Sequence, residues 1–273
     1  MFGVGVGVRV GGFTASSGSG FDPDAQAFIT ATAITNTTQQ NAINALVIGL
    51  KTDLLWTKML AIYPFVGGTA TSCKYNLKDP RDLDVAFRLN FVNVGWNFSS
   101  LGVTPNGIDT YANTFFIPAN NWSSGNSSSS VYSRTNNVEN TNLWGTRGGA
   151  SATLFTSAFN TSGGLTSCFH NTNGNTGLNT TTSALNFISS RINSSNQIQG
   201  VNGTNQSDAS NESLTFSPHP IYLSALNYVG SPQFFSTRQL AFSHIGYGLT
   251  QAECTLLFNR IQTFQTTLGR ANP

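Results

Sequence analysis

The character of the sequence changes near Gly67, and this change restricts the possible folds more than any other feature. Before Gly67 the chain has the periodicity of helices; after it come short candidate strands rich in Asn, Ser, Thr and Gly. A chain with many hydroxyl and amide groups but few acids or bases suits a rigid structural or surface-binding protein better than an enzyme. Between Asn120 and Pro218 the only charged residues are Arg134, Glu139, Arg147, Arg191, Asp208 and Glu212.

Charge is scarce in the whole chain of 273 residues, and this excludes some classes of protein. Charged residues make up 9% of the sequence, against about 25% in typical globular domains. The formal net charge of +2 comes without a basic cluster, so no nucleic-acid partner is expected. The longest apolar run, Ala45 to Leu50, is too short to span a bilayer.

Two helix starts precede Gly67. At Asp22-Pro23 the Asp can accept hydrogen bonds from free N–H groups, and Pro fits the first helical position. Asn36 begins a second helix, with Gln39 in the position of a capping box. This helical stretch is short and needs a partner surface to bury its apolar side. The apolar stripe runs through Ile43, Leu46, Val47, Leu50 and Leu54, and we expect Leu55, Met59 and Ile62 to continue it as far as Pro64.

The remainder of the chain predicts a β-sandwich. Residues Asp84 to Phe91 alternate between apolar and polar, as in a strand with one buried face. Many short strands separated by turn signals such as Asn106-Gly107 indicate antiparallel sheets. Further strands are expected at Tyr111–Ile117, Ser130–Thr135, Ala152–Phe159, Leu185–Ser189, Leu214–Phe216, Ile221–Asn227 and Arg238–Ile245.

The two ends of the chain differ. Thr250-Gln251-Ala252-Glu253 is a capping box that predicts a C-terminal helix with an apolar stripe through Leu257, Ile261, Phe264 and Leu268. The first residues alternate Gly and Val from Gly3 to Val8, which fits either a disordered end or a strand that adds to another subunit's sheet. The predicted division is a flexible arm at 1–21, a helical attachment or oligomerisation region at 22–68, and the sandwich at 69–273.

Two groups of motifs resemble known families. Leu240 to Glu253, with its Leu-Thr-x-x-Glu ending, and the strand Ile221 to Leu226 resemble the closing elements of concanavalin A-like jelly-roll domains of the laminin-G and pentraxin type. Leu55 to Gly68, Tyr75 to Pro80 and Gly102 to Gly107 resemble tail-fibre or other virion proteins of Bacteroidetes tailed phages. The likeness extends over about residues 22–270, although residues 120–218 match only in composition. It implies a fold and a virion setting, but no characterised ligand site.

Catalysis and metal binding find little support in the sequence. Glucanases with this fold carry paired carboxylates in a Glu-x-Asp-x-x-Glu strand, whereas Glu139, Glu212 and Glu253 have no acid two residues away. The three histidines are scattered, and no G-x-S-x-G motif accompanies them. Three separate cysteines, Cys73, Cys168 and Cys254, are expected to be buried thiols. Asp79, Asp82 and Asp84 form a weak candidate Ca²⁺ site, but Lys78 and Arg81 among them favour local salt bridges instead. No other cofactor is expected.

Sugar recognition fits the composition better. Lectin-like sites combine an exposed aromatic ring with neutral Asn, Ser or Thr groups on loops. Trp122, Trp96 and Trp144 lie in or beside such loops, and Trp122 has the most polar neighbours. The alternative interpretation is that these rings are core or rim aromatics.

Together these observations predict a non-enzymatic phage virion protein, located in a tail or head fibre, that binds host-surface glycan. The expected partners are other virion proteins, the glycan and further copies of the chain, in a trimer by analogy with fibre proteins. A capsid-decorating or assembly protein without a ligand is the alternative, and a polysaccharide depolymerase is disfavoured by the missing acids.

Overall fold

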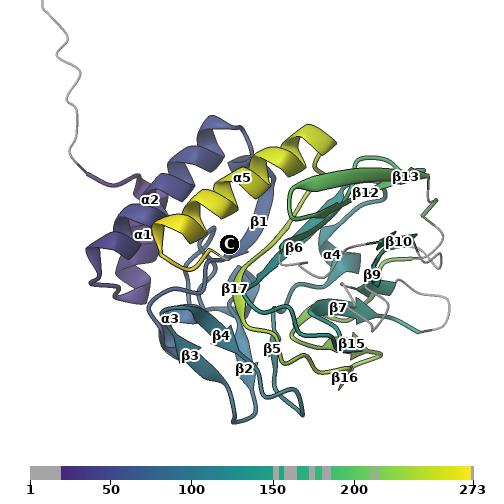
Figure 1. Ribbon diagram of the computed structural model, residues 1–273, viewed down its shortest axis with the longest axis horizontal. Helices are drawn as coiled ribbons and strands as arrows, with labels where there is room; N and C mark the ends of the chain where they lie inside the picture. Colours follow the sequence, from purple (N-terminus) through teal and green to yellow (C-terminus); the bar gives the residue numbers. More distant parts are fainter. Residues whose placement is uncertain are drawn as a thin grey trace, which may run out of the picture.

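The computed structural model describes residues 20–149, 154–156, 165–171, 176–179, 186–209, 211–212 and 215–271. Among these residues two β-sheets face each other, and helices cover the outer side of one of them (Figure 1). A mainly β, sandwich-like fold that begins with helices and closes with a C-terminal helix is therefore confirmed. The predicted arm at 1–21 falls almost entirely outside the described residues.

The first sheet is antiparallel and lies under the helices. Its central strands pair over long registers, with Ser130 opposite both His244 and Ile188. The order is β13 (Thr204–Ala209), β12 (Asn196–Val201), β11 (Asn186–Arg191), β6 (Ser127–Ser133), β17 (Leu240–Gly246), β4 (Gly102–Thr104) and β3 (Asn97–Ser99), with β1 (Met59–Tyr63) also on β17.

The second sheet packs against the free face of the first. All its pairs are antiparallel except β15 with β7, which run parallel. The order is β10 (Thr176–Asn179), β9 (Leu165–His170), β8 (Leu154–Thr156), β7 (Trp144–Arg147), β14 (Tyr222–Leu223), β5 (Tyr111–Asn113) and β2 (Asn90–Val92), with β15 (Leu226–Tyr228) on β7 and β16 (Ser231–Gln233) on β15.

The three long helices begin at the predicted caps. Asp22 accepts from Asp24 N before α1 (Pro23–Thr32), and Asn36 accepts from Gln39 N before α2 (Thr37–Thr52). Thr250 and Glu253 form the reciprocal capping box of α5 (Gln251–Thr267). Short helices occur at α3 (Ala70–Cys73), α4 (Pro118–Asn121), η1 (Trp56–Lys58) and η2 (Asp84–Ala86). In the part of the chain that the structure describes, none of the helices is long and apolar enough to cross a membrane.

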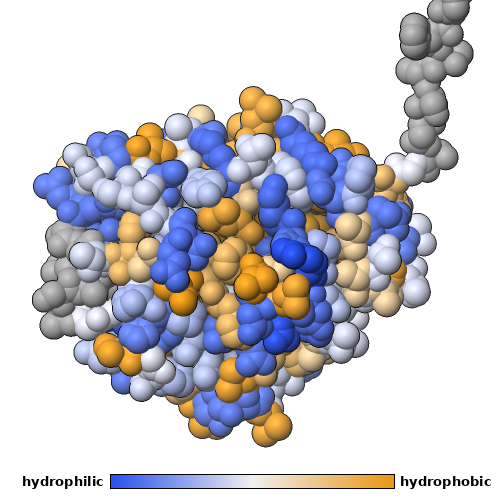
Figure 2. Space-filling view, turned by 180° about the vertical axis from the view of Figure 1, so that it is seen from behind, coloured by the Kyte–Doolittle hydropathy of each residue, from blue (hydrophilic) through white to orange (hydrophobic). Residues whose placement is uncertain are grey.

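The surface is mixed rather than divided into polar and apolar sides. On the face opposite to that of Figure 1, hydrophobic residues form small patches among hydrophilic ones (Figure 2). Strongly exposed apolar side chains are Val94, Ile108, Leu54 and Val85, at 90%, 75%, 77% and 75% exposure. Leu54 ends the predicted stripe, so the exposed end of that stripe does not join the core.

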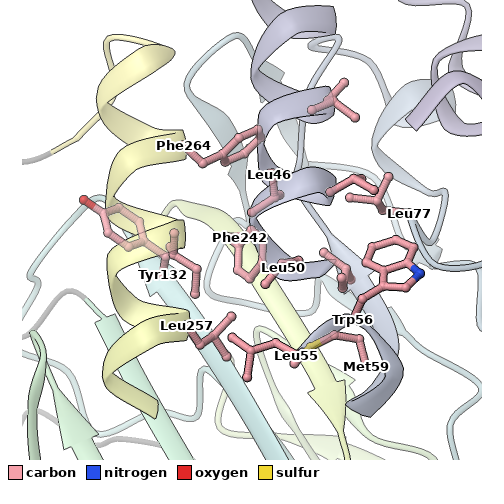
Figure 3. Close-up of a cluster of buried hydrophobic side chains, with 14 of the residues drawn as sticks. Leu46, Leu50, Leu55, Trp56, Met59, Leu77, Tyr132, Phe242, Leu257 and Phe264 are labelled. Atoms are coloured by element: carbon pink, nitrogen blue, oxygen red, sulfur yellow. The ribbon is translucent and has the colours of Figure 1, made fainter. Parts of the chain in front are cut away.

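A first core, which we call the helix-side core, lies between the helices and the first sheet (Figure 3). Leu46 and Leu50 of α2 point toward Phe242 of β17, and Leu257 and Phe264 of α5 close the space from the other side. The stripe on α2 is thus buried within its own chain, on the sandwich. Residues 22–68 and the sandwich share one core, because Met59 and Ile62 belong to it as well.

A second core, the inter-sheet core, lies between the two sheets and is richer in aromatic and polar side chains. Phe116, Trp122, Trp144 and Phe187 supply much of its apolar volume. Ser127, Ser129, His170, Ser189 and Arg191 are also fully buried in this layer or directly beside it. Buried polar groups require hydrogen-bond partners, and most of those found here come from neighbouring strands.

Two elements differ from prediction. Residues 59–63 form β1 rather than the end of a helix, because Leu54 adopts a positive φ of 59° and ends the helical path. Residues 84–91 were expected to be a strand, but η2 occupies 84–86 and β2 begins only at Asn90. There Phe87 has a φ of 57°, which breaks the extended conformation that the alternating pattern indicated.

The other predicted strands are partly confirmed. Strands lie within or overlap the expected ranges near 111, 130, 186, 222 and 240. The expected strand at 152–159 is described only at 154–156, and the one at 214–216 falls partly outside the described residues. The hairpin of β3 and β4 and the strands β12 and β13 were not predicted. Cys73 and Cys254 are buried free thiols as expected, while the side chain of Cys168 lies outside the described part.

Candidate functional site

A hollow with a volume of about 550 Å³ opens at one end of the sandwich. Its walls come from loops that the sheets hold in place: the turn before β6, the turn between β11 and β12, and the segments after β9 and before β14. We call it the Glu212 hollow. Its lining residues are Ala119, Ser124, Asn171, Ser194, Glu212, Thr215 and Phe216.

Glu212 forms hydrogen bonds with two of the loops that line the hollow. One carboxylate oxygen accepts from Ser124 Oγ and, at 3.1 Å, from Gly125 N. The backbone N–H of Glu212 donates to Ser194 O at 2.7 Å. The other carboxylate oxygen lies 4.0 Å from Arg191 Nε, and the two side chains are 6% and 0% exposed. This paired carboxylate brings almost no net charge to the surface of the hollow.

Arg191 connects the hollow to the buried polar layer. Its Nε donates to His170 O at 2.6 Å. The His170 ring in turn bonds Ser127 Oγ through Nε2 and Ser189 Oγ through Nδ1, both at 2.6 Å. The position of Glu212 is therefore fixed by strands β6, β9 and β11 rather than by the loop alone.

An aromatic stack forms the floor. The Phe216 ring packs on Trp122, with centroids 5.9 Å apart. Trp122 packs against Phe116 at 5.1 Å and is stacked on His170 at 6.0 Å. Its Nε1 donates to Gly246 O at 2.9 Å. Phe216 is half-buried while Trp122 is 6% exposed, so Phe216 supplies the accessible ring and Trp122 supports it.

Two serine–histidine clusters are present, and both are enclosed. His244 contacts Ser128 Oγ at 3.1 Å and Ser130 Oγ at 2.5 Å. Burial lowers the pKa of His244 to about 3, and burial together with the charge of Arg191 lowers the pKa of His170 well below its usual value. Both rings are 0% exposed, so they are neutral structural groups rather than bases within reach of a substrate.

The chemistry of the Glu212 hollow suits a neutral, hydroxyl-rich ligand. Ser124, Ser194 and Thr215 are exposed hydroxyl groups, and the Phe216 ring offers an apolar face. Sugars present the matching combination of ring hydroxyls and apolar C–H faces. The charge of Glu212 is paired with Arg191 behind the wall, so the hollow has no charge preference of its own.

Of the three tryptophans predicted as sugar-binding residues, two are buried and one is half-buried. Trp122 and Trp144 are 6% and 1% exposed, so the expectation that they are exposed loop aromatics is wrong. Trp144 Nε1 donates to Ser129 Oγ at 2.9 Å inside the inter-sheet core. Trp96 is half-buried, donates to Val92 O and packs edge-on against Phe91. The indole ring has a large apolar area, which favours its burial even where the neighbouring residues are polar.

The three aspartates of the candidate Ca²⁺ site are held by cations. Asp79 pairs with Arg81 at 2.5 Å and Asp84 with Arg88 at 2.8 Å. Asp82 pairs with Lys74 at 2.5 Å, and the hydrogen bond from Lys74 holds the pKa of this carboxyl below its usual value. Within the described residues, no group of three His, Cys, Asp or Glu side chains could hold a metal ion.

The glutamates are dispersed among separate contacts. Glu139 accepts hydrogen bonds from Ser236 Oγ and Thr237 N. Its carboxylate also lies 3.6 Å from Arg238 Nε. Glu253 caps α5 and pairs with Lys58 at 2.6 Å. Among the described residues, Glu139, Glu212 and Glu253 have three separate sets of partners. Each of these carboxylates is therefore held by its own local partners.

Comparison with known proteins gives fold information only. No family model and no curated protein sequence matches the chain. A mutant of Trypanosoma rangeli sialidase displaying trans-sialidase activity is similar in structure, with a TM-score of 0.53 and 10% identity over 81% of this chain. The K499G mutant of NanB sialidase from Streptococcus pneumoniae has a TM-score of 0.38 and 11% identity over 50% of this chain.

This chain spans a minor part of those enzymes. It covers 39% of the Trypanosoma rangeli chain and 24% of the NanB chain. At such low identity the first likeness supports a shared sandwich-like fold. The fold thus occurs within enzymes, and the activity of this chain depends on its own residues.

Proposed function

We propose that this chain is a non-catalytic phage virion protein that attaches the particle to a glycan on the host surface, with the Glu212 hollow as its ligand site. The virion setting rests on the sequence resemblance. The observation that carries the glycan part is the lining of the hollow, where exposed hydroxyls surround the Phe216 ring and the one carboxylate is already paired.

The non-catalytic part of the proposal rests on the acids and histidines. Glu139 and Glu253 are engaged in their own local contacts, and Glu212 is 6% exposed. The histidines of the two serine clusters have no exposed surface. Release of reducing sugar from host polysaccharide by the purified protein would instead support a depolymerase, in keeping with the enzymes that share the fold.

Adhesion through such a site requires several copies. Neutral hydrogen bonds to a hydrated sugar largely replace bonds to water, so each site should bind weakly. Several weak sites on one particle produce strong attachment. A homo-oligomer, which we propose to be a trimer by analogy with fibre proteins, would supply them. Light scattering at micromolar concentration tests this point, and a monomer would count against it.

A second candidate is a capsid-decorating or assembly protein without a ligand. The observation that favours it is a pair of adjoining loops with exposed apolar tips, Val94 and Ile108, at 90% and 75% exposure. Asn106 Nδ2 reaches Val94 O at 3.5 Å, and Asn93 Nδ2 donates to Asp109 O at 2.9 Å, so the loops lie side by side. Such tips fit packing against another subunit.

A glycan array with a blocked variant distinguishes the two candidates. The protein is displayed in many copies on beads, and Ser194→Trp places a large ring at the exposed rim of the hollow. Ser195→Trp is the matched control, because Ser195 is exposed but does not line the hollow. We expect binding to neutral glycans that the first variant abolishes and the second retains. Absence of binding by the unmodified protein would favour the decorating protein, and equal binding by both variants would show that the hollow is not the ligand site.

A further inference from the structure

The outer face of the second sheet carries a row of aromatic and polar side chains. Ala112, Trp144 and Leu223 belong to the inter-sheet core. Since side chains alternate along a strand, their neighbours Tyr111, Asn113, Tyr222 and Arg147 lie on the opposite, outer face. Register places Asn90 beside Asn113, Asn113 beside Tyr222, and Arg147 beside Tyr228.

Two aromatic surfaces are available on this face. Tyr111 and Tyr222 are stacked with centroids 4.4 Å apart, and Tyr222 is 7% exposed, so Tyr111 is the outer ring. Tyr228 is half-buried and lies under the Arg147 guanidinium, which is 5.3 Å from the ring centroid. Asn90 is exposed, and Asn113 Oδ1 accepts from Phe115 N, which leaves its NH₂ group as a donor. Flat rings with amide groups beside them form a platform for sugar rings.

Arg147 gives this face a positive charge. Among the described residues, no carboxylate oxygen lies within 4.0 Å of the Arg147 guanidinium. Arg88 is an instructive contrast: it also lies over a ring, that of Phe115, but pairs with Asp84 at 2.8 Å. A cation kept on an aromatic ring without a counter-ion is complementary to an anionic ligand.

We propose that this tyrosine–arginine face binds a glycan strand that contains carboxylated sugars. Tyr111 and Tyr228 receive the apolar faces of two sugar rings, Asn90 and Asn113 bond hydroxyl groups, and Arg147 pairs with a sugar carboxylate. This site is separate from the Glu212 hollow in both residues and chemistry, because the hollow is neutral at its surface. Binding to the face should weaken with salt, whereas binding to the hollow should not.

The test uses matched polymers on the full chain. Polygalacturonate is the carboxylated probe, its methyl ester keeps the sugar backbone without the charge, and polyglutamate keeps the charge without the sugar. Arg147→Gln removes the proposed cation, and Arg81→Gln is the control because Arg81 is 61% exposed and its loss changes the net charge equally. Tyr111→Ala removes the outer ring, with thermal unfolding measured to check that the variant folds.

The expected result is binding to polygalacturonate that falls about tenfold between low and high salt and about tenfold with Arg147→Gln. Arg81→Gln should have little effect, and the methyl ester should bind like the arginine variant. Equal binding to polyglutamate, an equal loss with Arg81→Gln, or no binding to polygalacturonate would overturn the proposal. Because Ser194→Trp should not affect this binding, failure of the face and failure of the hollow are distinguishable.

Discussion

The helix-side core and the inter-sheet core share the first sheet, and they are built from different residues. The helix-side core is mainly aliphatic, with Ile43, Leu50 and Leu257 at 0% exposure. The inter-sheet core joins Trp122 and Trp144 to a buried layer of hydroxyls, His170 and Arg191. The difference teaches that both faces of the sheet secure the fold, while the inter-sheet face also supports a surface hollow through hydrogen bonds.

This division has a physical basis. Aliphatic side chains contribute through removal of apolar area from water and need no partners. Hydrogen-bonded polar groups contribute less net stability, but they fix directions and distances. The line from Ser127 and Ser189 through His170 and Arg191 to Glu212 ends at the wall of the hollow. The buried polar layer thus fixes the position of Glu212 in the wall of the proposed ligand site.

The largest expected effect comes from removing one ring from each core. Phe264→Ala and Trp122→Ala should each lower the free energy of unfolding by about 3–5 kcal/mol, because both side chains are buried. Urea denaturation measures the change. A loss below about 1 kcal/mol would show that the ring concerned is peripheral, and for Trp122 it would remove the support that we assign to the floor of the hollow.

The second-largest expected effect is a loss of folding stability at low pH. A buried neutral histidine has a lower pKa in the folded protein than in the unfolded chain, so its contribution is complete above about pH 6.5 and is lost as the pH falls. For His244, with a pKa lowered to about 3, the loss at pH 5 should be about 2 kcal/mol. His170 shifts in the same direction.

His244→Gln isolates the contribution of His244 to the pH dependence of stability. The amide can still form hydrogen bonds with Ser128 and Ser130 but does not titrate. We expect the variant to lose less stability than the unmodified protein between pH 7 and pH 5, whatever its stability at pH 7. An identical pH dependence of unfolding would show that His244 is not kept neutral by burial.

A smaller effect is expected at the start of the C-terminal helix. Thr250→Ala removes the side-chain acceptor for Glu253 N and should cost about 1 kcal/mol. The loss should appear in thermal unfolding while binding through the hollow remains unchanged, since Thr250 belongs to the helix-covered side. A change in glycan binding without a change in stability would contradict the division between the two cores.

Much of the helix-side core could be predicted from the sequence. The caps at Asp22, Asn36 and Thr250 and the apolar spacing of α2 and α5 are local signals, and the structure confirms them. The end of α2 was missed, because the positive φ of Leu54 reflects tertiary packing that no local residue preference announces. Met59 and Ile62 are apolar at helical spacing but also fit a strand that is buried on both faces.

The inter-sheet core and the hollow could not be predicted in the same way. Ser127 to Ser130 lack any apolar alternation, yet all four are 0% exposed in β6. The polar neighbours of Trp122 predict an exposed loop position, whereas its ring is buried. One signal was present: Arg191 and Glu212 are isolated charges in a segment almost without charge, and buried opposite charges tend to pair.

Hydrogen–deuterium exchange with a neutral glycan selected on the array tests the central claim most directly, namely that the loops above the polar layer hold the ligand. We predict that bound glycan slows exchange in the segments around Ser124 and Ser194 and leaves α1, α2 and α5 unchanged. Slower exchange confined to the helices, or to β5 and β15 on the outer face of the second sheet, would contradict the assignment of the Glu212 hollow as the site.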